Sequence, residues 1–122
     1  TRSQIPPHVF QNAPVDIPPF GRSRYNEKAD KRINIDHHIS NTGCGSLNII
    51  EPEKSSTCEL LYELLEKEQI DEEIAKTLYI GIIHDTGVFK YSNTSPQTLQ
   101  VAAELISFGF DFPRLIEPVL LI

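Results

Sequence analysis

Short alternating patterns of apolar and polar residues predict two strands in the first half of the chain. The segment "KRINIDHH" alternates with a period of two, which predicts a strand that ends near Asp36. The segment "LNII", residues 47–50, is a second short strand candidate. Between them, "SNTGCGS" is typical of a turn, because Gly43 and Gly45 are free to adopt a positive φ.

Apolar residues at helical spacing predict two helices further along. Ser56 with Glu59 three residues later forms the pattern of a capping box, and leucines follow at helical spacing. The next helix begins after Asp71, which can cap it, and has an apolar surface broad enough to be buried on most sides. It is expected to stop near Asp85, because Gly87 suits the position just past a helix C-terminus.

The last predicted element is a helix over "SPQTLQVAAELISFG". Ser95 is its expected cap, Pro96 its first residue and Gly109 its end. Strands mixed with helices of this length favour an α/β layered fold rather than a helix bundle.

Length and proline content predict the domain organisation. The chain has 122 residues, which suits one domain of modest size. Residues 1–19 contain five of the nine prolines, so neither a helix nor a central strand is expected there. The segment 1–19 is therefore predicted to be irregular, and the packed domain is predicted to span residues 20–122.

Charge and cysteine usage limit the classes of partner. The net charge of −6 argues against tight binding of long nucleic acid, although a small phosphorylated substrate fits if metal ions supply positive charge. Cys44 and Cys58 form no CxxC motif and are expected to be free thiols. No long apolar run or signal-like N-terminus is present, so we expect a cytoplasmic protein without a membrane partner.

Three side chains suited to metal binding come directly after the first predicted strand. Asp36, His37 and His38 combine a carboxylate with imidazoles, which suits Mn²⁺, Zn²⁺ or Fe²⁺, and ligands of open α/β sheets collect at the carboxyl ends of strands. If the backbone stays extended, neighbouring side chains point to opposite faces, so one histidine would bind metal while the other faces substrate or supports the ligands. A polar surface turn is the alternative.

Asp85 is a second candidate metal ligand. It follows a nearly apolar helix, where a carboxylate is costly unless it is paired or bound to a cation. The alternative is a solvated acid near the helix terminus, although an anion is unfavourable at the negative end of the helix dipole. His84 is ambiguous, because a histidine near that terminus also favours the dipole.

Two segments together resemble a known family. "INIDHHISN" followed by "GIIHDTGVFKYSNTSPQTL" resembles the DHH phosphoesterases, and within them the bacterial nano-RNases that also dephosphorylate 3′-phosphoadenosine 5′-phosphate (pAp). The resemblance runs from about Arg24 to about Ile116. It implies part of a Rossmann-like parallel sheet flanked by helices, a two-metal centre that usually holds Mn²⁺, and a small nucleotide or short oligoribonucleotide as substrate. The roles it implies are metal ligation by His37, Asp85 and Asp16, phosphate positioning by His38, orientation of the histidines by Asp36, and substrate contacts by Arg22 and Arg24.

The sequence also departs from the family pattern. Nothing in it resembles the family's first metal-binding motif, a His followed by a Pro-Asp-x-Asp-type segment, or the smaller C-terminal substrate domain. Residues 20–122 are therefore interpreted as a partial DHH domain that carries at most half of a two-metal site, and the chain alone is expected to be inactive or nearly so.

Two other readings of the chain stay open. In the first, it is a non-catalytic remnant that self-associates into a homo-oligomer through an exposed sheet edge and uncovered apolar helix faces. In the second, it is a mononuclear metal-binding module that uses His37, Asp85 and His84.

Overall fold

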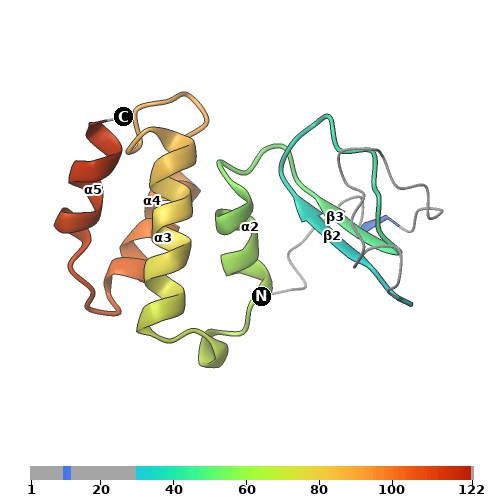
Figure 1. The fold of residues 1–122 in the computed structure, drawn as a ribbon, viewed down its shortest axis with the longest axis horizontal. Helices are drawn as coiled ribbons and strands as arrows, with labels where there is room; N and C mark the ends of the chain where they lie inside the picture. The colour runs from blue at the N-terminus through green and yellow to red at the C-terminus, as the bar shows by residue number, and fades with distance from the viewer. Residues whose placement is uncertain (1–9, 12–29, 122) are drawn as a thin grey trace. The chain divides into compact units, whose positions relative to one another are not determined.

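The computed structural model describes residues 10–11 and 30–121 of the chain. The chain divides into two compact units, residues 1–52 and residues 53–122, and each is described by itself. The described part of the first unit contains strands β1 (Phe10–Gln11), β2 (Ile33–Asp36) and β3 (Leu47–Ile50) (Figure 1). The second contains helices α2 (Thr57–Leu64), α3 (Glu72–Thr86), α4 (Pro96–Ile106) and α5 (Phe112–Leu120), with a short 3₁₀ turn, η4 (Lys67–Gln69), after α2.

The first unit is a small sheet in which β3 lies between β1 and β2. β2 and β3 run parallel, with Asp36 opposite Ile50, while β1 pairs antiparallel with β3. Both predicted strands and the predicted α/β class with a parallel sheet are confirmed. β1 lies inside the proline-rich segment as an edge strand, a position that tolerates neighbouring prolines. The predicted boundary at residue 20 lies outside the described residues and stays a prediction.

The loop between β2 and β3 uses its two glycines in different ways. Gly43 has a φ of +83°, the left-handed conformation expected for it. Gly45 serves a close approach, because a Cβ there would lie 2.9 Å from the carbonyl oxygen of Arg32. Asn48, which is fully buried, bonds both the N–H and the carbonyl of Gly45 with its side chain.

Helices α2, α3 and α4 of the second unit begin at the capping residues that the sequence predicts. The Ser56 Oγ accepts from the Glu59 N–H at the start of α2, and the Asp71 carboxylate accepts from the Ile74 N–H at the start of α3. Gly87 ends α3 with a φ of +57°. Ser95 caps α4 and Pro96 is its first residue, whereas α4 ends at Ile106, slightly before Gly109.

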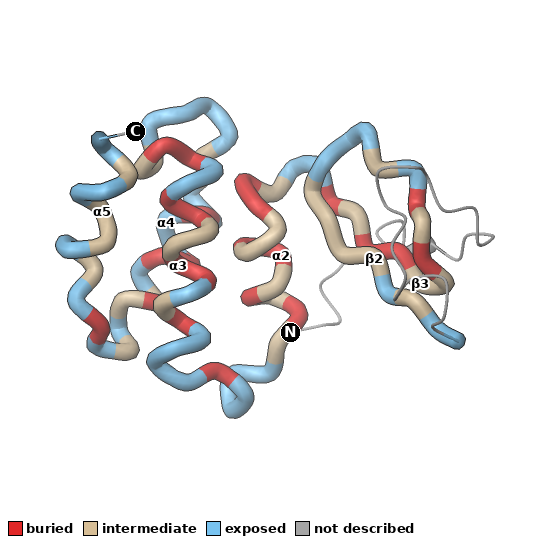
Figure 2. The backbone as a smooth tube through the Cα atoms, viewed as in Figure 1, coloured by how far each residue is buried: buried red, intermediate tan, exposed pale blue. Residues whose placement is uncertain are grey.

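Helix α3 packs against α2, α4 and α5, and the core of this unit lies around it (Figures 1 and 2). Ile82 and Ile83 of α3, Leu60 of α2 and Leu105 of α4 are fully buried or nearly so. No helix in the described part of the chain is long and apolar enough to span a membrane.

Helix α5 was not expected from the sequence, where the last predicted element ended at Gly109. Pro113 lies in its first turn and Pro118 lies inside it, so the sequence pattern did not indicate a helix. Phe112, Leu115 and Val119 nevertheless pack on the core, and the Phe112 ring lies edge-on to Tyr79. Burial of this face explains why the helix forms despite its prolines.

The carboxylate of Glu104 on α4 links that helix to α2 and η4. It accepts one hydrogen bond from the Tyr62 hydroxyl and one from the Lys67 ammonium, each 2.9 Å long. The bond from Lys67 lowers the pKa of Glu104, burial opposes this, and the Tyr62 hydroxyl lowers the pKa further. An acid whose pKa is lowered by folding stabilises the protein above its ordinary pKa, and the contribution is lost as the pH falls through the lowered value.

We therefore expect Glu104→Gln to remove part of the acid sensitivity of this unit. Urea unfolding near neutral pH and in acid is the measurement, and the variant is expected to lose less stability between the two conditions than the wild type. Tyr62→Phe keeps the contact with Lys67. Its loss of stability on acidification is expected to lie between those of Glu104→Gln and the wild type. An identical loss on acidification in Glu104→Gln and the wild type would contradict the expectation.

Candidate functional site

The sequence places a carboxylate and two imidazoles at the carboxyl end of β2. Asp36 is the last residue of the strand, and His37 and His38 follow it directly. Each offers one ligand atom, and these three atoms lie within 4.8 Å of one another. The Asp36 side chain is mostly buried, His37 is half-buried and His38 is exposed. The cluster is therefore accessible from solvent through His38.

Three hydrogen bonds from the described part of the chain hold Asp36. Its Oδ1 accepts from the His37 N–H and contacts His38 Nδ1 at 2.7 Å, while its Oδ2 accepts from the Asn41 amide at 3.0 Å. Partial burial raises the pKa of Asp36, but the bonds from Asn41, His37 and His38 outweigh it and bring the pKa to about 2. Asp36 is therefore a carboxylate at neutral pH.

The contact with Asp36 fixes which nitrogen of His38 carries a proton. A carboxylate can only accept hydrogen bonds, so Nδ1 of His38 is the protonated nitrogen. Nε2 then carries a lone pair in the neutral ring and an N–H in the imidazolium. Such a pairing with a carboxylate is the usual way in which proteins orient a metal-binding or catalytic imidazole.

His37 and His38 do not point to opposite faces. The strand ends at Asp36, and the two ring centroids lie 4.3 Å apart. The two rings therefore lie side by side, unlike the arrangement on which the expected division of roles depends. Both imidazoles therefore belong to the same cluster, and the separate roles implied for them stay predictions.

A group of asparagines supports this cluster, and the sequence analysis did not identify it. Asn34 and Asn41 exchange two side-chain hydrogen bonds, and Asn34 also donates to Asn48 Oδ1. Asn34 and Asn48 are partners in the register of β2 and β3, so their amides lie side by side. Polar residues at matched positions of two neighbouring strands are the signal that could have revealed the group. It connects the interior of the sheet to the Asp36 carboxylate through Asn41.

Asp85 lies in the last turn of α3, in the second unit, and is exposed. Its carbonyl accepts from the Asn93 side chain at 3.0 Å. Burial raises the pKa of the nearby Cys58 thiol, and the Asp85 carboxylate raises it further. The prediction that Asp85 and His37 share a cation joins the two units and stays a prediction.

The other predicted site residues are Asp16, Arg22, Arg24 and His84. Asp16, Arg22 and Arg24 lie outside the described residues, and their roles stay predictions. His84 is exposed and lines a cavity of about 200 Å³ together with Lys90 and Tyr91.

The donor set of the first unit fits a divalent cation. Nitrogen and oxygen ligands together suit the transition metals named above. Atoms that bind one such cation at about 2 Å lie no more than about 4 Å apart, so the observed spacing needs only a small closing movement. Asp36, His37 and His38 could therefore contribute to one site.

The chain belongs to the DHH family of phosphoesterases. The family model that describes the N-terminal domain of the DHH family matches residues 15–82, more than half of the chain. This match includes the Asp-His-His cluster and both strands of the parallel pair.

The chain is similar to several bacterial proteins. The chain is 39% identical over 85 residues to the bifunctional oligoribonuclease and PAP phosphatase NrnA of Thermus thermophilus, covering 68% of this chain and 26% of that protein. It is 37% identical over 90 residues to the protein of the same name from Bacillus subtilis, covering 70% and 29%. An exopolyphosphatase-related protein from Bacteroides fragilis has a similar structure, with a TM-score of 0.72 and 30% identity over 80% of this chain and 30% of that one. The chain thus spans less than a third of each of these proteins.

Proposed function

We propose that this chain is part of a metal-dependent phosphoesterase that hydrolyses small nucleotide phosphoesters, pAp or short oligoribonucleotides, with Mn²⁺ as its metal. The observation that carries the proposal is the Asp36, His37 and His38 cluster at the end of β2 in a chain of the DHH family. The relatives from Thermus thermophilus and Bacillus subtilis are named as bifunctional oligoribonucleases and PAP phosphatases. A cytoplasmic location is part of the proposal.

The residues would share the work as follows. His37 and Asp85 would hold a cation, which would supply positive charge to phosphate oxygens and help to activate a water. Asp36 keeps the His38 ring oriented through Nδ1. His38 then presents Nε2 outward, where its imidazolium form donates a hydrogen bond to a phosphate oxygen. The proposal also includes Asp16 as a further metal ligand. It assigns phosphate contacts to Arg22 and Arg24.

The chain alone is proposed to bind Mn²⁺ but to turn over substrate poorly, because its 122 residues include no match to the family's first metal-binding motif. Calorimetric titration with Mn²⁺ is expected to show binding that His37→Ala weakens by at least tenfold. Thr77→Ala, a change at an exposed position of α3, is the control and is expected to bind as the wild type does.

Assays of the chain with pAp and with a dinucleotide, with and without Mn²⁺, test the second half of the proposal. Product formation is expected to stay near the uncatalysed background. Mn²⁺-dependent hydrolysis that disappears in His37→Ala would show that the chain is active alone. Absence of Mn²⁺ binding by the wild type would remove the metal site itself.

The alternative, a self-associating remnant without catalysis, is favoured by a different observation. Ile33 on β2 is 65% exposed, and Ile39 just beyond the strand is 87% exposed. β2 has β3 as its one strand neighbour in the described part of the sheet. Light scattering separates the two readings, because a monomer that binds Mn²⁺ contradicts the remnant.

A further inference from the structure

The end of α3 has an unusual backbone that returns the chain toward the helix. Gly87, Val88 and Phe89 all have a positive φ, of 57°, 55° and 66°. Two of these residues carry a side chain, for which the left-handed conformation is unfavourable. Consecutive left-handed residues persist only where surrounding bonds enforce them, and they concentrate at functional sites.

Most last-turn carbonyls of α3 find backbone partners in this return. The Ile83 carbonyl accepts from the Val88 N–H, and the Thr86 carbonyl accepts from the N–H groups of Lys90 and Tyr91. The side chain of Thr86, which is fully buried, also accepts from the Phe89 N–H. The carbonyl of Asp85 differs from these, because it accepts a hydrogen bond from a side chain, that of Asn93.

The Asn93 amide bonds two carbonyls at once. Its Nδ2 donates to the carbonyl of Asp85 at 3.0 Å and to the carbonyl of Ser55 at 3.1 Å. Both partners are acceptors, so the amide nitrogen must face them. Ser55 precedes α2, and Asp85 is in the last turn of α3. One side chain therefore ties the start of α2 to the end of α3.

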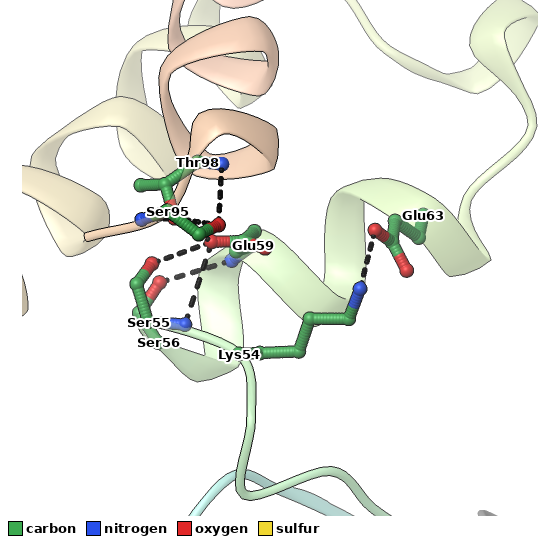
Figure 3. Close-up of polar contacts among 7 residues, drawn as sticks. All are labelled: Lys54, Ser55, Ser56, Glu59, Glu63, Ser95 and Thr98. Atoms are coloured by element: carbon green, nitrogen blue, oxygen red, sulfur yellow. Dashed lines mark hydrogen bonds and ion pairs between the residues drawn. The ribbon is translucent and has the colours of Figure 1, made fainter. Parts of the chain in front are cut away.

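The Ser55 end of this bridge is itself fixed. Ser55 is fully buried, and its hydroxyl donates to the Glu59 carboxylate at 2.6 Å. Glu59 in turn accepts from Thr98 on α4 (Figure 3). Asn93 thus connects the backbone of Asp85 to a buried polar group shared by two other helices.

We propose that Asn93 is a positioning residue for Asp85: by bonding the Asp85 and Ser55 carbonyls, it fixes the last turn of α3 and with it the direction in which the Asp85 carboxylate is presented to a divalent cation. The proposal rests on the proposed function in its assignment of Asp85 as a ligand. The alternative is that Asn93 only caps a helix, and the two differ in what its loss does to Asp85.

The test compares Asn93→Ala with Ser107→Ala in the 122-residue chain. Ser107 is the matched control, because its hydroxyl donates to the Glu104 carbonyl in the last turn of α4. Both variants are expected to lose a similar, small amount of stability in urea. Only Asn93→Ala is expected to weaken Mn²⁺ binding in calorimetry, by about 10–100-fold, the usual effect of removing a group that supports a metal ligand.

A second measurement needs no metal. Three-bond NMR couplings about χ1 of Asp85 are expected to report one rotamer in the wild type and in Ser107→Ala, and averaging in Asn93→Ala. Unchanged couplings and unchanged Mn²⁺ affinity in Asn93→Ala would overturn the proposal and leave a helix cap. If the wild type binds no Mn²⁺, the proposed metal site fails, and the couplings still decide whether Asn93 positions Asp85.

Discussion

Glu59→Ala is expected to lower the free energy of unfolding by about 3 kcal/mol, because it leaves buried hydrogen-bond donors without an acceptor. The side chain of Glu59 is 1% exposed. Its Oε1 accepts from the Ser55 N–H at 3.4 Å, from the Ser55 hydroxyl at 2.6 Å and from the Thr98 hydroxyl at 2.6 Å (Figure 3). Removing a buried partner costs about 1–3 kcal/mol for each donor left unpaired, and the side-chain cavity adds to this.

Glu63→Ala is the matched control on the same helix. Glu63 pairs with Lys54, and its side chain is 23% exposed (Figure 3). Loss of such a partly exposed ion pair is expected to cost about 0–1 kcal/mol. Glu59→Gln, which keeps an oxygen acceptor, is expected to fall between the two. Urea unfolding measures all three variants, and equal losses in Glu59→Ala and Glu63→Ala would show that the buried network contributes little.

Gly81→Ala is the second change with a large expected effect. A Cβ at position 81 would lie 2.2 Å from the Cys58 Sγ and 3.0 Å from its Cβ, so the Cys58 side chain or the two helices would have to shift. Overpacking of this kind costs about 1–3 kcal/mol, and the gain of about 1 kcal/mol from replacing glycine inside a helix offsets part of it. We expect a net loss of about 0–2 kcal/mol in urea unfolding.

The double variant Gly81→Ala with Cys58→Ala separates steric overlap from other causes. Removing the sulfur relieves the shortest contact, although the Cβ of residue 58 remains 3.0 Å away. The double variant is expected to be more stable than Gly81→Ala alone, with a coupling of about 1 kcal/mol or more between the two positions. Additive effects of the two substitutions would rule out the overlap as the cause.

The elements that local signals determine were predictable from sequence. Ser56, Asp71 and Ser95 start helices through short-range bonds to the backbone, and Gly87 ends one, so their effects can be read from neighbouring residues. Glu59 shows the limit of this reasoning. A capping box assigns its carboxylate to the Ser56 N–H, but the carboxylate bonds Thr98, 39 residues away in sequence. Such a contact depends on how α4 packs beside α2.

The sequence predicted part of the candidate site, and the part that it did not predict depends on the path of the loop after β2. A strand that ends at Asp36 was evident from alternation, and it placed the Asp-His-His cluster at the correct end of the sheet. The shared side of the two histidines was not evident, because it depends on the backbone turn after the strand. Asn41 was also missed, since its bond to Asp36 follows from the path of the loop rather than from a motif.

The contact between Cys58 and Gly81 provides a natural chemical probe of this unit. An alkylating group on the Cys58 sulfur would need space that the backbone at position 81 already fills. Burial and the Asp85 carboxylate also keep the thiol protonated, which slows its reaction. The rate at which a maleimide labels the half-buried Cys58 is therefore expected to rise when α2 and α3 part from each other, without any added cysteine.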